Sequence, residues 1–63
     1  MLDILNLTYP ELERFFVEEL GEPRFRAAQV WQWLWQKHAT SFDAMTDVSK
    51  SLRARLNEVA EIV

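Results

Sequence analysis

Residues 23–38 read PRFRAAQVWQWLWQKH, and this stretch decides the fold. Its core-type side chains recur at spacings of three and four residues, so at about 100° per residue they share one broad helical face. Pro23 suits the first turn of a helix, because backbone N–H groups in that turn have no acceptor within the helix and the lack of one costs nothing. We therefore predict an amphipathic helix from Pro23 to about His38. Its apolar stripe consists of Ala27, Val30, Trp31, Leu34, Trp35 and His38.

The segment before this stretch predicts a first helix over about residues 9–20. Thr8 and Glu11 have the spacing of a capping box, in which side chains satisfy the free N–H groups at a helix start. Gly21 follows as a C-terminal residue that can adopt a left-handed conformation. The apolar face between these ends comprises Tyr9, Leu12, Phe16 and Leu20, with Phe15 beside them.

The segment after the central stretch predicts two more helical pieces. Residues 42–45 suit a single helical turn, and Thr46 or Asp47 can cap a third helix over about residues 48–60. Strand signals are nearly absent, because the chain has no Asn-Gly or Asp-Gly turn and no long alternation of polarity. We expect an all-α fold, a small three-helix bundle with an extra helical turn. The stripe of the third helix comprises Val48, Leu52, Leu56 and Val59, and Val63 continues it.

Composition excludes several classes of function. The chain has 63 residues, enough for one domain, and contains no cysteine and one histidine. Disulfides, thiolate metal sites, thiol catalysis and multi-histidine sites are therefore excluded. No apolar run reaches the ~18 residues of a membrane span, and Asp3 stands where a signal peptide needs a cation. We expect a monomeric cytoplasmic domain with no catalytic residue, metal or cofactor of its own.

The net charge of −3 argues against a free-standing nucleic-acid binder, but the charge is unevenly distributed. Residues 1–22 carry six acids and one arginine, whereas residues 23–40 carry three cations and no acid. An anionic partner would therefore approach the second helix and the start of the third. The alternative is that these are ordinary solvated faces. The predicted RNA-facing cations are Arg24, Arg26, Lys37, Lys50 and Arg53.

Trp33 is the second informative feature of the central helix. It lies roughly 120° from the middle of the apolar stripe, on a flank that also carries Arg26, Gln29 and Lys37. A ring flanked by cations can stack on a nucleobase while the cations hold phosphates. The alternative is that Trp33 packs on the core or against another domain. Both roles stay open from the sequence.

Three segments carry a resemblance to a known family. They are LTYPEL at residues 7–12, GEPRFRAAQVWQWLW at residues 21–35 and FDAMTDVSKSLR at residues 42–53. In this order they resemble the N-terminal accessory domain of the radical-SAM adenine-C2 RNA methyltransferases, the RlmN/Cfr family. The motif positions, most of them expected to be packing residues, are Phe25, Arg26, Gln29, Trp33 and Leu34, then Phe42, Met45, Lys50, Leu52 and Arg53.

The resemblance implies that residues 1–63 form one helix-hairpin-helix-like accessory domain, and that a catalytic radical-SAM barrel absent from this chain follows it in the parent enzyme. That enzyme would use a [4Fe-4S] cluster and S-adenosylmethionine to methylate an adenine C2 in large-subunit ribosomal RNA and, in some members, transfer RNA. The domain itself would contact RNA without catalysing the reaction, and its own catalytic domain would be a partner. The alternative is a helical protein-interaction or interdomain docking module with no direct RNA contact.

Overall fold

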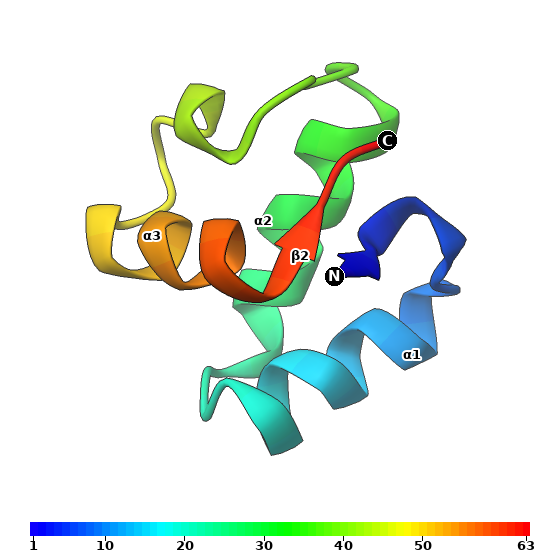
Figure 1. Cartoon of the computed structure of the whole chain (residues 1–63). Coiled ribbons are helices and arrows are strands. Elements are labelled where there is room, and N and C mark those ends of the chain that lie inside the picture. The colour runs from blue at the N-terminus through cyan, green and yellow to red at the C-terminus, as the bar shows by residue number, and fades with distance from the viewer.

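The computed structural model describes all 63 residues, and helices make up most of it (Figure 1). The short elements η1 and η3 are 3-10 turns, and η2 is a π-helical turn. The predicted small helical domain of three helices with an extra turn near residue 42 is confirmed. The elements follow in the order β1 (Leu2–Asp3), η1 (Ile4–Asn6), α1 (Tyr9–Arg14), η2 (Phe15–Glu19), α2 (Arg24–Trp35), η3 (Phe42–Ala44), α3 (Lys50–Val59) and β2 (Ala60–Glu61).

α1 begins with the complete capping box that the sequence predicts. The Glu11 N–H donates to the Thr8 hydroxyl over 3.4 Å, and the Thr8 N–H donates to the Glu11 carboxylate over 2.8 Å. The Thr8 backbone N–H, and after it the Thr8 side chain, hold the pKa of Glu11 below its ordinary value of 4.5. Both reciprocal hydrogen bonds therefore fix the start of this helix.

The end of the first helical segment differs from the predicted continuous α-helix. From Phe15 the turn widens into η2, and the Leu20 N–H bonds to the Phe15 carbonyl five residues back over 3.2 Å. Gly21 then adopts a left-handed φ of 65°, as predicted. The Glu22 N–H closes this end by bonding to the Phe16 carbonyl over 2.9 Å.

α2 ends three residues earlier than the sequence predicts. Its last residue is Trp35, and His38 has a left-handed φ of 53°. The Ala39 N–H bonds to the Trp33 carbonyl over 2.8 Å, so the chain closes the helix end here instead of continuing it. His38 is therefore exposed and does not belong to the apolar stripe, which corrects the prediction.

α3 begins at Lys50, two residues later than predicted, and its cap is Ser49. The Ser49 hydroxyl accepts a hydrogen bond from the Leu52 N–H over 3.3 Å. The predicted caps, Thr46 or Asp47, are therefore both wrong, and the Asp47 carboxylate accepts from the Trp33 indole instead. Val48 is buried as expected, but it lies in the turn before the helix.

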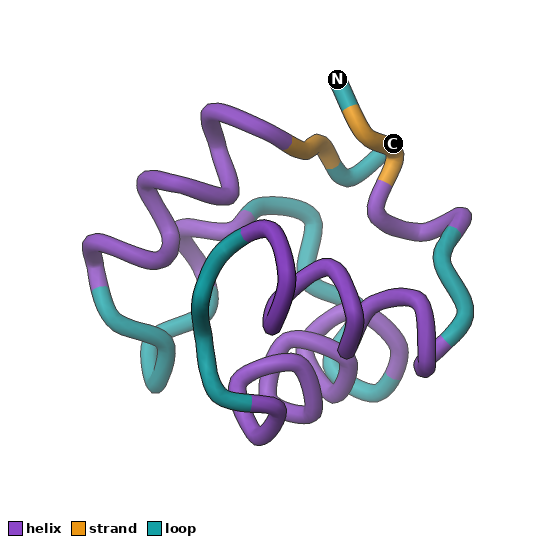
Figure 2. The backbone as a smooth tube through the Cα atoms, turned by 90° about the horizontal axis from the view of Figure 1, so that it is seen from below, coloured by secondary structure: helices purple, strands orange, loops and turns teal.

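A parallel pair of two-residue strands is another part of the fold that the sequence did not predict. Leu2 of β1 pairs with Ala60 of β2, and Asp3 pairs with Glu61. Two residues are too few to produce an alternating pattern, so strand rules could not detect them. The pairing places both ends of the chain on one side of the molecule (Figure 2).

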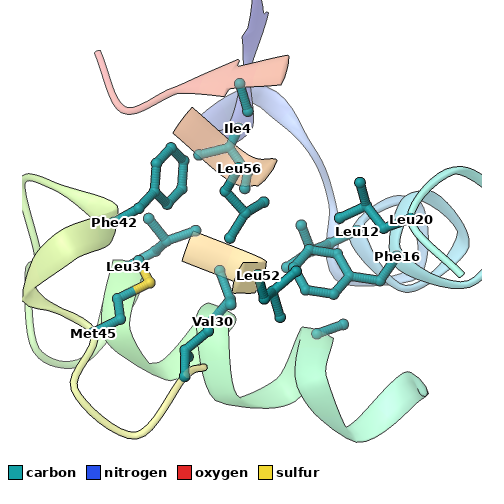
Figure 3. Packing of buried hydrophobic residues seen from close by; sticks show 13 residues of the cluster. Ile4, Leu12, Phe16, Leu20, Val30, Leu34, Phe42, Met45, Leu52 and Leu56 are labelled. Atoms are coloured by element: carbon teal, nitrogen blue, oxygen red, sulfur yellow. The ribbon is translucent and has the colours of Figure 1, made fainter. Parts of the chain in front are cut away.

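Thirteen buried residues form one apolar cluster that joins all three helices (Figure 3). The predicted core residues Leu34 and Leu52 are only 4% and 2% exposed. Trp35 and Val59 were assigned to the core by their stripes but are 43% and 40% exposed, because each is the last residue of its helix. Val63 lies beyond β2 and is exposed as well. The cluster comprises Ile4, Leu12, Phe16, Leu20, Ala27, Val30, Leu34, Phe42, Met45, Val48, Leu52, Leu56 and Ala60.

Candidate RNA-binding surface

α2 presents three of the five predicted RNA-facing cations. Arg24 is its first residue, Arg26 lies in its first turn, and Lys37 lies two residues beyond its last residue. Arg26 and Trp33 are seven residues apart within α2, so at the helical repeat they share a face, and the Lys37 ammonium reaches the same face because it lies over the Trp33 ring. Gln29 and Trp33 lie between Arg26 and Lys37 on that face. We term these four residues, Arg26, Gln29, Trp33 and Lys37, the cationic flank.

The two cations of the cationic flank are held by contacts that use no carboxylate, whereas the Trp33 indole between them is bonded to the Asp47 carboxylate. Arg26 Nη1 donates to Gln29 Oε1 over 3.0 Å, and the Arg26 guanidinium lies 4.7 Å from the centroid of the Phe25 ring. Lys37 Nζ lies 4.1 Å from the centroid of the Trp33 ring. These contacts position the cations without neutralising them, so the flank keeps its positive charge for an anion.

The only ion pair of the chain lies elsewhere. Arg14 and Glu18 approach to 3.9 Å across α1 and η2, and both side chains are mostly exposed. The other arginines and lysines have no carboxylate oxygen within ion-pair distance. Glu11, Glu18 and Glu19 line a depression with Arg14 and Phe15 on this first helical segment. The first helical segment is therefore predominantly acidic, whereas α2 carries cations and no acid, as the sequence predicts.

Trp33 is half-buried and packs against the hydrophobic cluster. Its indole Nε1 donates to Asp47 Oδ1 over 2.6 Å, which ties α2 to the turn before α3. Since Lys37 lies over the ring and the indole N–H is already bonded, the part of Trp33 that could meet a ligand is small. The packing role is present in the structure, and the base-stacking role stays a prediction.

Lys50 and Arg53 lie together on α3, in a shallow depression that also contains Asp43, Ala54 and Asn57. Arg53 Nη1 donates to the Asp43 carbonyl over 2.8 Å, and Asn57 Nδ2 donates to the Asp43 carboxylate over 3.3 Å. Arg53 therefore holds η3 against α3. With an aspartate in the same depression, this region attracts an anion less strongly than the cationic flank.

Three residues have roles that the sequence reasoning missed. Phe25 was expected to pack, but it is 55% exposed on the outer side of α2. Asp47 holds the Trp33 indole instead of capping a helix. Arg55 Nη1 donates to the Leu20 carbonyl over 2.7 Å and ties α3 to the end of η2. The helical repeat places Phe25 opposite the apolar stripe, so its exposure to solvent could have been predicted from the sequence.

No cluster of three or more histidine, cysteine, aspartate or glutamate side chains has the arrangement of a metal site. None of the helices combines the length and the apolar character needed to cross a bilayer.

The fold and the surface define a class of protein, a small three-helix domain whose second helix carries cations and no acidic residue. A family model described as the ribosomal RNA large subunit methyltransferase N-terminal domain matches residues 2–62. The chain belongs to this family, which confirms the resemblance found in its sequence.

Comparison with individual proteins agrees with this assignment. The chain is 73% identical over 62 residues to the dual-specificity RNA methyltransferase RlmN of Nitratidesulfovibrio vulgaris (strain DSM 19637 / Miyazaki F), covering 98% of this chain and 17% of that protein. It is 54% identical over 63 residues to the dual-specificity RNA methyltransferase RlmN 2 of Myxococcus xanthus, covering 100% of this chain and 17% of that protein. The chain thus spans about a sixth of the length of these relatives.

A solved structure shares the fold. The crystal structure of a radical SAM methyltransferase from Sphaerobacter thermophilus superposes with a TM-score of 0.93 at 35% sequence identity. The match covers 100% of this chain and 18% of that one. All the helices and the strand pair described above are therefore included in the matched region.

Proposed function

We propose that these 63 residues form the RNA-contacting, non-catalytic N-terminal domain of a cytoplasmic radical-SAM RNA methyltransferase. The substrate of the full-length enzyme would be an adenine C2 in large-subunit ribosomal RNA and, in addition, in transfer RNA. The cations of the cationic flank, which lie on a segment without acids and form no ion pair, are the observation that carries the RNA-contacting role. Its cations have no carboxylate partners, so phosphate oxygens would be their first anionic ligands.

The family implies a [4Fe-4S] cluster and S-adenosylmethionine, and the residues of this chain do not fit the cluster. Iron–sulfur clusters are held by cysteine thiolates, and the chain contains none. Its one histidine, His38, is exposed and belongs to no group of three or more potential metal ligands. We therefore assign the cluster, the methyl donor and the reaction to the part of the enzyme outside these residues.

Salt dependence tests the RNA-contacting role in the full-length enzyme. Phosphate contacts release counterions, so with roughly three to five contacts from this domain, log affinity should fall with log salt at a slope of about −2 to −4. The double substitution Arg26→Glu and Lys37→Glu should abolish the contribution of the domain to RNA affinity. It should also make the slope of log affinity against log salt less steep. Filter binding of ribosomal RNA fragments at several salt concentrations measures both quantities.

The matched control reverses two charges on the acidic segment. Glu18→Lys and Glu19→Lys together alter exposed side chains of η2, and binding should stay unchanged or become tighter. Circular dichroism should show the same helix content in both double variants, because none of the four residues is buried. If the Arg26→Glu, Lys37→Glu enzyme binds RNA as tightly as the original, α2 is not the RNA face.

A second candidate function, docking against the rest of the enzyme, is favoured by an aromatic cluster on a different face of α2. The rings of Tyr9 and Trp31 meet edge to face at 5.3 Å between centroids, and Trp31 meets Trp35 at 5.6 Å. Trp35 is 43% exposed, although it is large and apolar. Trp33 and Trp35 lie about 200° apart around the helix, so docking and RNA contact would use different faces. Docking through these rings would survive high salt, whereas RNA contact would not.

A further inference from the structure

The outward face of α2 has an unusual composition for an acidic protein. Phe25, Gln29, Gln32 and Gln36 follow one another at spacings of four, three and four residues, so they form one stripe. This stripe lies opposite the buried residues Ala27, Val30 and Leu34 of the same helix. It contains no charged residue, although ten acids occur elsewhere in the chain and none lies between Glu22 and Asp43.

Phe25 is the aromatic residue at one end of this stripe. It is the second residue of α2 and is 55% exposed. The Arg26 guanidinium lies 4.7 Å from the ring centroid and covers one face of the ring. Arg26 is itself held by its hydrogen bond to Gln29. The exposed area of Phe25 must therefore lie on the other face and the edge, on a rigid helical support.

We infer that Phe25 is a stacking platform for an unpaired nucleobase of the RNA, with Arg26 closing the opposite face of the ring. Arg24 is exposed next to it and has no carboxylate partner, so it is placed to hold the adjoining phosphate. The free amides of Gln32 and Gln36 can exchange hydrogen bonds with base edges, since an amide both donates and accepts. This inference rests on the proposed RNA-contacting function and names the part of the RNA that α2 recognises.

Phe25 is better suited to this role than Trp33. Trp33 packs against the core, its indole N–H is bonded to Asp47, and Lys37 lies over its ring. A base could stack on Trp33 only after displacing Lys37. Stacking on Phe25 displaces no contact present in the structure, so the base meets a preformed surface.

The experiment compares bases with abasic sites in the full-length enzyme. Two hairpin oligoribonucleotides with the same backbone charge are used, one with normal loop bases and one that keeps the target adenine but has abasic nucleotides at the other unpaired positions. The original enzyme should bind the first about five- to one-hundred-fold more tightly, which is the range of one stacked base. Phe25→Leu, which keeps an apolar side chain but removes the ring, should abolish that ratio without changing the salt slope. Phe25→Trp should restore it.

The matched control is Val17→Ala, which changes another exposed apolar side chain, 44% exposed on η2, and should leave the ratio unchanged. If Phe25→Leu keeps both the ratio and the salt slope of the original enzyme, the stacking role is wrong while the RNA-contacting function stands. If the Arg26→Glu, Lys37→Glu enzyme binds RNA as tightly as the original enzyme, the proposed function itself fails. If Phe25→Leu lowers the melting temperature of the full-length enzyme but not the ratio, Phe25 docks against the rest of that enzyme and the stacking role is overturned.

Discussion

Two residues of the chain adopt left-handed backbone conformations, and they end two different helices. Gly21 has a φ of 65° and His38 a φ of 53°. No atom lies within 4 Å of a Cβ built at Gly21, so the glycine is required by its backbone conformation and not by lack of space. His38 carries the steric cost that Gly21 avoids. The first helix end could be predicted from its glycine, whereas no residue in the sequence indicated the second.

The same backbone geometry predicts opposite effects of substitution at these two positions. Gly21→Ala should lower the free energy of unfolding by about 1 kcal/mol, because a Cβ disfavours the left-handed region. His38→Gly should leave the free energy unchanged or raise it by up to about 1 kcal/mol, since it relieves that penalty. Urea denaturation followed by circular dichroism measures both. If His38→Gly instead lowers the free energy of unfolding, the His38 imidazole makes a contact that stabilises the fold by more than the left-handed backbone conformation costs.

At the scale of the element, the capping box of α1 makes stability depend on pH. The pKa of Glu11 is lowered below its ordinary value of 4.5 by the hydrogen bonds to Thr8. A carboxyl with a lowered pKa in the folded state stabilises fully above its unfolded pKa and loses that contribution as the pH falls through the folded pKa. Glu11→Gln should therefore weaken the loss of stability on acidification below about pH 4.5.

The measurement is urea denaturation at a series of pH values on the original chain and on Glu11→Gln. Glu19→Gln is the control, because its exposed carboxylate accepts no hydrogen bond in the structure. The control should follow the original pH dependence. Identical acid slopes for all three proteins would mean that the Thr8 contact does not persist in solution.

Helix existence was predictable from this sequence, and helix ends were predictable only where a strong local signal exists. The Thr8–Glu11 box and Gly21 are such signals, and both are confirmed. The start of α3 was misplaced because Thr46, Asp47 and Ser49 are all residue types that cap helices; in the structure Ser49 is the cap and Asp47 is bonded to Trp33. That bond joins residues fourteen apart, beyond the reach of local pattern rules.

At the scale of the whole molecule, stability depends on the single apolar cluster. Leu34→Ala or Leu52→Ala should each lower the free energy of unfolding by about 2–5 kcal/mol, because both side chains are buried. So small a core rarely supplies more than about 3–5 kcal/mol, so either variant should be largely unfolded at room temperature. Thermal melts followed by circular dichroism test this.

The control for the core variants is Val59→Ala, which removes methyl groups from a side chain that is 40% exposed. Its effect should stay within about 0.5 kcal/mol. A cooperative melt of Leu34→Ala close to that of Val59→Ala would contradict the assignment of Leu34 to the core.

The surface was less predictable than the core. Charge segregation is a property of the sequence itself, so the acid-free α2 and the acidic first helix could be identified in advance. The exposure of Phe25 could also have been predicted, because it lies opposite the apolar stripe, whereas the exposure of Trp35 could not, because Trp35 lies within that stripe and is exposed only where the helix ends. The presence of Asp43 in the same depression as Lys50 and Arg53 depends on how η3 packs on α3, which is a tertiary contact.

The pairing of β1 with β2 has a mechanical consequence. The strands are parallel, and each lies within three residues of an end of the 63-residue chain. Tension applied outward at both ends therefore pulls the two strands past each other and loads their hydrogen bonds in shear, all at once. Antiparallel strands pulled from adjacent ends would instead separate one bond at a time. The helices between the two strands therefore bear the applied force only after the hydrogen bonds of the strand pair have broken.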